Sequence, residues 1–443
     1  MLYDTITALA TPYGTGAIAI IRLSGEKTFP ILKKVFTGDL DQAETNTMNY
    51  GYLKDPATGK VIDEVLVAIY RHPHSYTGED LAEINLHGGT FVVNTVLSLL
   101  ISNGAVMAQR GEFTLRAYLH GKMDLTQAEA INDLIEAQHL DQLTLATDEL
   151  RGSVSKLINP LLEEMVTTIG NIEVNIDYPE YQDVKVLSDQ EVKPMVDKWL
   201  TDIKNILAKA ESGKIVREGV STAIIGKPNV GKSSLLNALL EEDKAIVTAI
   251  PGTTRDIVEG EIRLQNVTLK LMDTAGIRHT KDTVEKIGVE RSLDLVKKAQ
   301  LILLVLDNSK PLDSDDKELL ELTKDKNRII VYNKADLKSD KDGVETSALK
   351  GEIEPLIKKI NEMYATVHED IQDPTMSNPR QIGLLNQAYR SLEDAKRSLN
   401  EGRELDLVQV DINQAHDYLR EIVGKYTKED LLDDIFSRFC LGK

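Results

Sequence analysis

The chain has 443 residues, of which 42% are hydrophobic and 28% charged, and its formal net charge is −19 at pH 7. This length exceeds what one hydrophobic core usually serves and predicts about two to four domains. The negative charge argues against indiscriminate binding of polyanions, because the field of the whole protein would repel them, but it does not forbid a local basic patch. The single cysteine, Cys440, excludes a disulfide framework.

The beginning of the sequence gives no sign of export. The stretch MLYDTITALATPYG lacks the basic region followed by an apolar run that marks a secretion signal. Apolar runs elsewhere are too short to cross a bilayer. We therefore expect a cytoplasmic protein with no membrane partner.

Residues 1–118 are expected to form a compact α/β or α+β domain. The runs AIAIIRLSG, VLVAIYRH and FVVNTVLSLL have strand-type composition, and they alternate with glycine-rich turns such as PYGTGA and LHGGT.

Residues 119–216 are expected to be helical, with a break near IDYPEYQD. Asp124 and Gln127 have the spacing of a capping box. Apolar side chains then recur at helical spacing at Leu125, Ala128, Ile131, Leu134 and Leu140.

Residues 217–376 have a different pattern, in which the apolar runs STAIIG, VTLKLMD, LILLVLD and RIIVY alternate with helical segments. This alternation is typical of βαβ units with a mostly parallel sheet. Residues 377–443 are again expected to be helical, and Gly424, a glycine that follows the last apolar position, is the expected end of one helix. Two apolar stripes mark these helices: Ile382, Leu385, Tyr389, Leu392, Ala395 and Leu399, then Leu405, Val408, Ile412, Ala415, Leu419 and Ile422. The α/β domain is thus predicted to be inserted into a helical domain.

A phosphate-binding motif opens the inserted domain. GKPNVGKSS follows the strand-like run STAII and matches G-x-x-x-x-G-K-[ST] in the order strand, loop, helix. Glycines allow backbone N–H groups to surround phosphates, while Lys232 reaches the β- and γ-phosphates and Ser233 is placed to bind Mg²⁺. The loop residues expected to contact nucleotide are Asn229, Val230, Gly231, Lys232, Ser233 and Ser234.

Three further motifs follow in the order typical of GTPases. Asp273, Thr274, Ala275 and Gly276 form DTAG; Asn333, Lys334 and Asp336 belong to NKAD; Ser347, Ala348 and Leu349 belong to TSAL. The carboxylate of Asp336 can accept from both N1–H and N2–H₂ of guanine, whereas adenine would leave it unpaired. The sequence therefore predicts a Ras-like, doubly wound P-loop GTPase domain that binds GTP.

The means of hydrolysis needs a separate explanation, because Ile277 stands where many GTPases have a water-orienting glutamine. Thr254 is the expected second Mg²⁺ ligand beside Ser233. Neutral oxygens suited to K⁺ are expected from Asn229, Thr248, Ile250 and Thr253. Asn229 could equally be an ordinary loop residue, and Arg255 and Arg278 are alternative sources of positive charge.

The motifs GKPNVGKSS, IPGTTRD, DTAGIR, NKAD and FCLGK, with ATPYGTGAIAIIRLSG, YTGEDLAEINLHGG and RGEFTLRAYLHGKMDLTQAEA, resemble the tRNA-modification GTPases called MnmE or TrmE. The likeness spans the whole chain. It implies an N-terminal domain that forms a homodimer and holds a 5-formyl- or methylene-tetrahydrofolate. It also implies a flavin-dependent partner of the MnmG type, in a heterotetramer that adds a (carboxymethyl)aminomethyl group to C5 of the wobble uridine of certain tRNAs, with K⁺-stimulated GTP hydrolysis.

The resemblance also implies roles for individual residues. Glu285 matches the acid that orients attacking water. Arg22, Glu83, Lys122 and Lys443 match folate-contacting positions, although each charge could instead be a solvated surface group. Cys440 lies in FCLGK, which resembles the family's FCIGK. Its thiolate could add to uracil C6, or the residue could be a small buried hydrophobe.

Two other functions compete with this interpretation. The chain could be a regulatory or ribosome-assembly GTPase whose flanking domains only bind partners, because fold does not determine function. It could also be a folate-binding scaffold with a degenerate nucleotide site, although Lys232, Asp273 and Asp336 argue against this. Measuring modified wobble nucleosides in a deletion strain would separate tRNA modification from the regulatory or ribosome-assembly function.

Overall fold

The computed structural model describes residues 4–177, 188–241, 260–272, 295–337, 343–425 and 429–443. The chain divides into two compact units. The first unit contains Met1–Asp197 and Gln387–Lys443, and the second contains Lys198–Asn386. The limits of the four segments expected from the sequence remain a prediction, because these two units are defined by contacts and their limits cut through two long helices.

The N-terminal part of the first unit is built on a sheet whose described strands follow the order β3-β4-β5-β2-β1-β6. The β1–β6 pair is parallel, whereas the remaining pairs are antiparallel. The elements are β1 (Ile6–Leu9), β2 (Ile18–Ser24), α1 (Thr28–Val35), β3 (Thr47–Lys54), β4 (Val61–Tyr70), β5 (Leu81–His87), α2 (Thr90–Ser102), β6 (Val106–Met107) and α3 (Glu112–Leu119).

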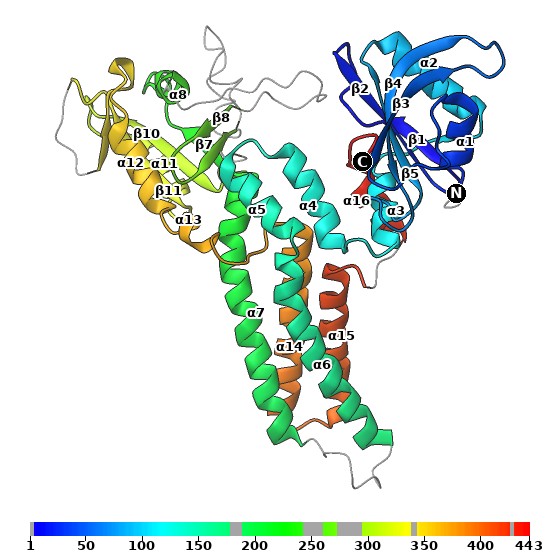
Figure 1. Ribbon diagram of the computed structural model, residues 1–443. Helices are drawn as coiled ribbons and strands as arrows, with labels where there is room; N and C mark the ends of the chain where they lie inside the picture. The colour runs from blue at the N-terminus through cyan, green and yellow to red at the C-terminus, as the bar shows by residue number, and fades with distance from the viewer. Residues whose placement is uncertain (1–3, 178–187, 242–259, 273–294, 338–342, 426–428) are drawn as a thin grey trace. The chain divides into compact units, whose positions relative to one another are not determined.

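Helices α1 and α2 pack on one face of this sheet (Figure 1). Strand β4 alternates accordingly, with Val65, Val67 and Ile69 buried in the shared core. Side chains on the other face of β3 and β4 remain in water, as the exposure of Tyr50 and Leu66 shows. The result is a two-layer α+β domain, which is one of the two classes expected from the sequence.

The run FVVNTVLSLL was predicted to be a strand, and that prediction is wrong. It forms helix α2, with Val93, Val96, Leu99 and Leu100 buried. Its β-branched residues gave the strand signal. The buried positions recur at intervals of three and four residues, which is the helical period, and packing against the sheet decides the structure.

The helical part of the first unit begins where the sequence predicts. Asp124 accepts from the backbone N–H of Gln127, whose side chain accepts from the N–H of Asp124, so the predicted capping box is present. Gly424 has a φ of 79° just after α15, as expected for a helix stop. The helices are α4 (Leu125–Glu136), α5 (Leu140–Leu150), α6 (Ser153–Asp177), α7 (Asp189–Glu218), α14 (Pro379–Asn400), α15 (Leu405–Ile422) and α16 (Glu429–Ser437), of which α7 and α14 continue into the second unit.

Two sets of contacts in the first unit join segments that are distant in sequence. Helix α15 packs on α6, and α16 lies beside α3 (Figure 1). Phe436 and Phe439 share a core with Leu125 and Ile131 of α4. The end of the sequence is therefore anchored to helices of the N-terminal half.

The second unit is organised around a sheet whose described strands follow the order β12-β11-β10-β7-β9-β8. All neighbouring strands are parallel except the β8–β9 pair. The elements between α7 and α14 are β7 (Val220–Ile225), α8 (Lys232–Glu241), β8 (Glu261–Arg263), β9 (Thr268–Leu271), β10 (Leu301–Asp307), α11 (Ser314–Leu322), β11 (Arg328–Asn333), β12 (Val344–Thr346), η1 (Ala348–Lys350), α12 (Glu354–Met363) and α13 (Val367–Asp370).

This topology confirms the doubly wound α/β class. The central strands β7 and β10 are apolar and buried along almost their whole length, as expected where helices cover both faces of a parallel sheet. The carboxyl ends of β7, β10 and β11 carry the GKPNVGKSS loop, Asp307 and NKAD. In such folds ligands bind at this edge.

None of the helices formed by the described residues is both long enough and apolar enough to span a bilayer.

Candidate guanine-nucleotide site and C-terminal cluster

The phosphate loop, here residues 226–231, connects β7 to α8. A Cβ atom on Gly226 would lie 2.4 Å from the carbonyl oxygen of Val305 in β10. Gly231 has a φ of 99°, and a Cβ atom there would lie 2.1 Å from Nδ2 of Asn333. Glycine at these two positions therefore allows the loop to pass close to the neighbouring strands.

Lys232 begins α8, and its ammonium group lies inside the phosphate loop. Nζ donates to the carbonyl oxygens of Gly226 and Lys227, both at 2.7 Å. Burial lowers the pKa of Lys232, because a low-dielectric environment disfavours the charged form. A half-buried cation at a helix N-terminus, surrounded by backbone groups, is suited to a phosphate chain.

Asn333 connects the phosphate loop to the segment after β12. Its Nδ2 donates to the carbonyl oxygen of Val230 at 2.9 Å, and its Oδ1 accepts from the backbone N–H of Ala348 at 3.0 Å. The hydroxyl of Thr346 donates to the same Oδ1 at 3.3 Å. The phosphate loop, NKAD and TSAL segments are therefore joined around one buried amide.

Asp336 is held by the TSAL segment. Its Oδ1 accepts from the hydroxyl of Ser347 at 2.9 Å, and the ammonium of Lys350 lies 4.0 Å from Oδ2. One carboxylate edge is thereby fixed in direction, as recognition of a planar base requires. Leu349 of the same segment is 86% exposed.

Two lysines at this site form ion pairs that were not predicted from the sequence. Lys334 pairs with Asp307 at the end of β10, and Lys227 pairs with Asp316 at 2.8 Å and with Asp313. The bond from Lys227 lowers the pKa of Asp313 to about 2. Asp307 could have been predicted as a site residue, because it ends the strand-like run LILLVLD and ligands bind at the carboxyl ends of parallel strands.

Several predicted nucleotide and metal residues lie outside the described residues. These are Thr248, Ile250, Thr253, Thr254, Asp273, Thr274, Ala275, Gly276 and Glu285. Asn229 is exposed in the phosphate loop with a φ of 64°. Ser233 and Ser234 occupy the first turn of α8.

A second cluster of predicted residues lies in the first unit, around Arg22 of β2. Its Nε and Nη2 donate to Oε1 of Glu83 at 3.0 and 2.7 Å, and its Nη1 donates to the carbonyl oxygen of Gly442 at 3.1 Å. The guanidinium lies over the rings of Tyr76 and Phe113, 5.2 and 5.5 Å from their centroids. Packing and hydrogen bonds together fix this cation.

The FCLGK segment reaches this cluster because Gly442 fits closely against β1. Gly442 has a φ of 90°, and a Cβ atom there would lie 2.3 Å from the carbonyl oxygen of Leu9. Burial and the charge of Arg22 lower the pKa of Lys443, while Glu83 and Cys440 oppose the shift. Segments more than 400 residues apart therefore meet here.

Cys440 is exposed, so the interpretation of this residue as a small buried hydrophobe is wrong. It lies close enough to Lys443 for the two groups to interact electrostatically. The fourth predicted folate residue, Lys122, is exposed and donates to the carbonyl oxygen of Pro73 at 3.0 Å. The contacts thus bring Arg22, Glu83 and Lys443 together and give Lys122 a different partner.

Known protein families match the chain along almost its whole length. Residues 5–122 match the family model of the GTP-binding protein TrmE N-terminus, and residues 125–440 match that of the MnmE helical domain. A protein of Streptococcus pneumoniae described as tRNA modification GTPase MnmE is 48% identical over 454 residues, covering 100% of this chain and 99% of its own length. The corresponding protein of Lactiplantibacillus plantarum is 45% identical over 457 residues, with the same coverage. The chain belongs to the MnmE family.

Solved structures resemble part of this MnmE-family chain. The G domain of the T. maritima FeoB iron transporter is 28% identical, with a TM-score of 0.24, and the match covers 33% of this chain and 98% of that one. Era in complex with MgGDPNP and a 16S ribosomal RNA fragment is 24% identical, with a TM-score of 0.25, and the match covers 39% and 66%.

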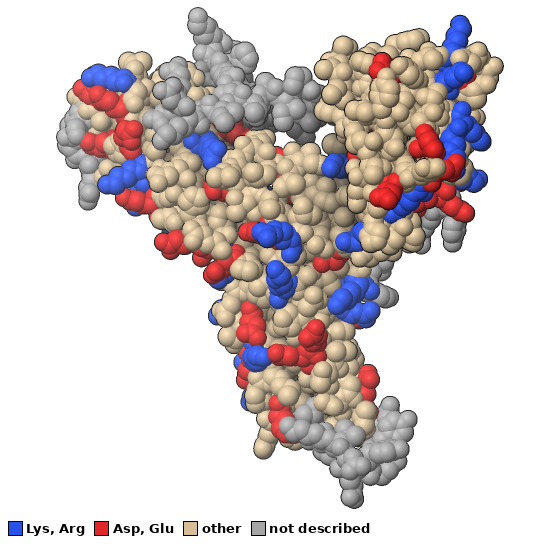
Figure 2. Space-filling view, in the orientation of Figure 1, with Lys and Arg blue, Asp and Glu red and all other residues tan. Residues whose placement is uncertain are grey.

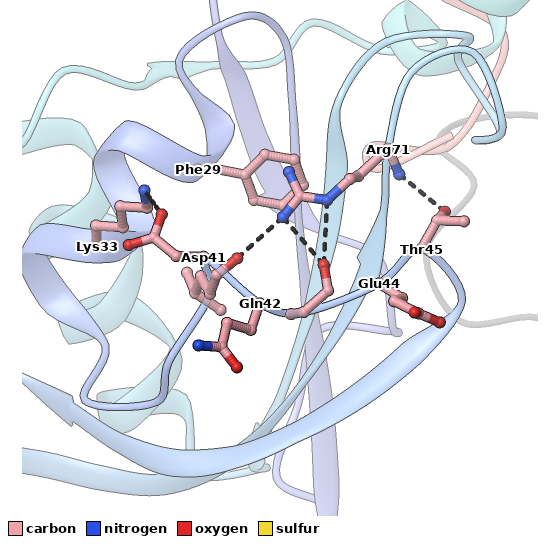
Figure 3. Close-up of a pocket in the computed structure, with 9 residues that line it drawn as sticks. Phe29, Lys33, Asp41, Gln42, Glu44, Thr45 and Arg71 are labelled. Carbon is pink, nitrogen blue, oxygen red and sulfur yellow. Dashed lines mark hydrogen bonds and ion pairs between the residues drawn. The ribbon is translucent and has the colours of Figure 1, made fainter.

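A cavity of about 580 Å³ lies elsewhere in the N-terminal domain, between α1 and the segment before β3 (Figure 3). Arg71 stacks on Phe29, 4.5 Å from the ring centroid, and donates to the carbonyl oxygens of Leu40 and Ala43. These bonds hold the 40–45 segment in place. The cavity therefore belongs to the packing of this segment and contains none of the predicted site residues of the MnmE-family chain.

Proposed function

We propose that this chain is a K⁺-stimulated GTPase that acts with a flavin-dependent partner to modify the wobble uridine of certain tRNAs. Membership of the MnmE family makes it a GTP hydrolase acting in tRNA modification. The observation that carries the nucleotide part is the buried amide of Asn333, which joins the phosphate loop to the base-reading segment through Val230 and Ala348.

The site residues have distinct roles in this proposal. Lys232 and the N–H groups of the phosphate loop bind the phosphates, and Asp336, held by Ser347, accepts from guanine. Ser233 and Thr254 would hold Mg²⁺, and Asn229 would contribute an oxygen to K⁺. When bound, these cations offset the charge that develops on the phosphates during hydrolysis.

Water needs its own orienting group, because Ile277 has no polar atom in its side chain. Glu285 is proposed to orient this water. Separately, Thr248, Ile250 and Thr253 are proposed to complete the set of K⁺ ligands that includes Asn229. Exposed Asn229 in its left-handed turn supports the K⁺ proposal, since its side chain is not part of the core. Replacing K⁺ by Na⁺ is expected to lower the GTPase rate strongly; equal rates would contradict the role of Asn229.

The Arg22 cluster is proposed to bind a tetrahydrofolate. The carboxylate of Glu83 can accept from pterin amines, and Lys122 and Lys443 can pair with the glutamate tail. Cys440 is exposed beside this cluster, which supports attack of its thiolate on uracil C6. The Sγ–C6 bond would form as the C5–C6 π electrons move to C5, which makes C5 the nucleophile; later loss of the C5 proton would restore the C5–C6 double bond and expel the thiolate. A tetrahydrofolate held by Arg22, Glu83, Lys122 and Lys443 would supply the one-carbon unit. A Cys440→Ser chain that modified tRNA normally would contradict this.

Partner binding is proposed from surfaces of the first unit. Met48, Tyr50 and Leu66 are 56%, 57% and 44% exposed on the sheet face opposite α1 and α2, which supports a homodimer through the N-terminal domain. On the face shown in Figure 2, the described Lys and Arg side chains are interspersed with Asp and Glu. We therefore expect the flavin-dependent partner to supply much of the positive charge that attracts tRNA. The complex is proposed to act in the cytoplasm.

The direct test is the nucleoside composition of tRNA from a strain that lacks this gene. The strain is complemented with the wild-type chain or with Lys232→Ala, and wobble uridines are quantified by mass spectrometry. We expect modification with the wild-type chain and its loss with Lys232→Ala. Unchanged wobble uridines in the deletion strain would instead favour a regulatory or ribosome-assembly GTPase.

A further inference from the structure

Lys334 is held in an unusual backbone conformation between two residues that contact the nucleotide-binding segments. Its φ is 67°, in the left-handed region that non-glycine residues adopt at a cost. Asn333 before it bonds to the phosphate loop, and Asp336 after it bonds to Ser347. The side chain of Lys334 therefore starts at the edge of the proposed guanine pocket.

The ammonium of Lys334 is fixed by a residue outside all the nucleotide-binding motifs. Nζ donates to Oδ2 of Asp307 at 2.6 Å, and the side chain of Asp307 is only 9% exposed. Oδ1 of Asp307 accepts from the backbone N–H of Ser309 at 3.0 Å and from its hydroxyl at 2.6 Å. Both oxygens of this carboxylate are thus engaged, so it is itself rigid.

The backbone around the pair is equally well connected. Asp307 is paired with Asn333 in the β10–β11 register, and the N–H of Asn308 donates to the carbonyl oxygen of Asn333 at 2.8 Å. The N–H of Ala335 donates to the carbonyl oxygen of Thr346 at 3.0 Å. The two ends of the ion pair are therefore set by neighbouring strands.

We propose that Asp307 is a positioning residue for guanine-nucleotide binding, acting through Lys334; this inference rests on the proposed function. A lysine side chain loses much rotamer freedom when it is ordered against a ligand. The bond to Asp307 orders Lys334 in the free protein, so less freedom is lost on binding. In this proposal Asp307 contacts neither base nor phosphate and affects the nucleotide only by holding the ammonium group of Lys334.

A merely structural ion pair would give a different result from a positioning pair. Loss of a structural pair lowers stability and leaves affinity unchanged. Loss of a positioning pair weakens binding of GDP and GTP alike while kcat at saturating GTP stays the same, because the reacting γ-phosphate is bound by other residues. A double-mutant cycle on nucleotide affinity distinguishes the two roles further, because only a positioning pair makes the effects of changing Asp307 and Lys334 on affinity non-additive.

The experiment measures dissociation constants and dissociation rates of a fluorescent GDP with the full chain, for wild type, Asp307→Ala, Asp307→Asn, Lys334→Met and the double variant Asp307→Ala/Lys334→Met. We expect Asp307→Ala to weaken binding roughly 10-fold, mainly through faster dissociation, with kcat within about twofold. Asp307→Asn keeps an acceptor for Lys334 and should restore part of the affinity. The double variant should bind like Lys334→Met.

Asp325→Asn is the matched control, because Asp325 is an exposed acid in the loop between α11 and β11, and it should bind like wild type. Wild-type affinity in Asp307→Ala, or losses that multiply in the double variant, would overturn the inference while leaving the proposed function intact. If Asp307→Ala does not fold, the GDP dissociation constants and rates of Asp307→Asn and Lys334→Met are compared with those of the wild type instead, and wild-type affinity in both variants would overturn the inference. Absence of GDP binding by the wild type would overturn the proposed function, and this inference with it.

Discussion

Substitution of Gly231 by alanine tests the packing of the phosphate loop against Asn333. The added Cβ would lie 2.1 Å from Nδ2 of Asn333, so the amide must move and its bond to the carbonyl oxygen of Val230 must break. Asn333 is 3% exposed, which leaves no room for water to replace this bond without a further shift. The change therefore separates the phosphate loop from the base-reading segment.

The size of the effect follows from two terms. A left-handed φ costs an alanine about 1–2 kcal/mol, and an unsatisfied buried amide or carbonyl costs about 1–3 kcal/mol. Together these give about 2–5 kcal/mol, divided between the stability of the second unit and its affinity for nucleotide. We expect GDP affinity to fall by at least about tenfold and the melting temperature to fall as well.

Gly351→Ala is the control for backbone strain alone. Gly351 has a φ of 76°, and a Cβ atom there would have no neighbour within 4 Å. It should lower the melting temperature modestly and leave GDP affinity unchanged. Calorimetric titration with GDP and thermal unfolding measure both effects. Equal GDP affinity in Gly231→Ala and Gly351→Ala would refute the assigned contact with Asn333.

Two further outcomes are expected. Gly442→Ala places a Cβ atom 2.3 Å from the carbonyl oxygen of Leu9, so it should displace the FCLGK segment and reduce wobble-uridine modification in vivo while the GTPase rate of the purified chain is kept; normal modification would contradict this docking. Burial and neighbouring cations lower the pKa of His416 below its usual 6.5, so the fold favours the neutral imidazole, and the stability this gives above pH 6.5 is lost as the pH falls through the lowered pKa. Urea unfolding between pH 5 and 7 should show a smaller pH dependence for His416→Gln than for wild type, and parallel curves would contradict the shift.

The sequence predicts much of the fold because periodicity and motif order are local signals. The capping box at Asp124, the helix stop at Gly424 and the alternating strands of the second unit follow from spacing alone. Helix α2 was mistaken for a strand because residue type was weighted above the spacing of its buried positions. Local composition fails where packing against a sheet decides the structure.

The candidate sites were predictable only in part. GKPNVGKSS and NKAD indicate what binds, but the links through Asn333 and Asp307 depend on which strands become neighbours. Arg22 and Gly442 are 420 positions apart in the sequence, so no local pattern predicts that they form a hydrogen bond. The exposure of Cys440 likewise depends on how the segment after α16 packs.

The central claim is that the second unit's phosphate loop and Asp336 form a guanine-specific nucleotide site. It is tested most directly by calorimetric titration of the purified full chain with GDP and with ADP in the presence of Mg²⁺. The account predicts saturable heat with GDP, none with ADP, and loss of the GDP signal in Asp336→Ala. Absence of heat with GDP, or equal binding of the two nucleotides, would contradict it.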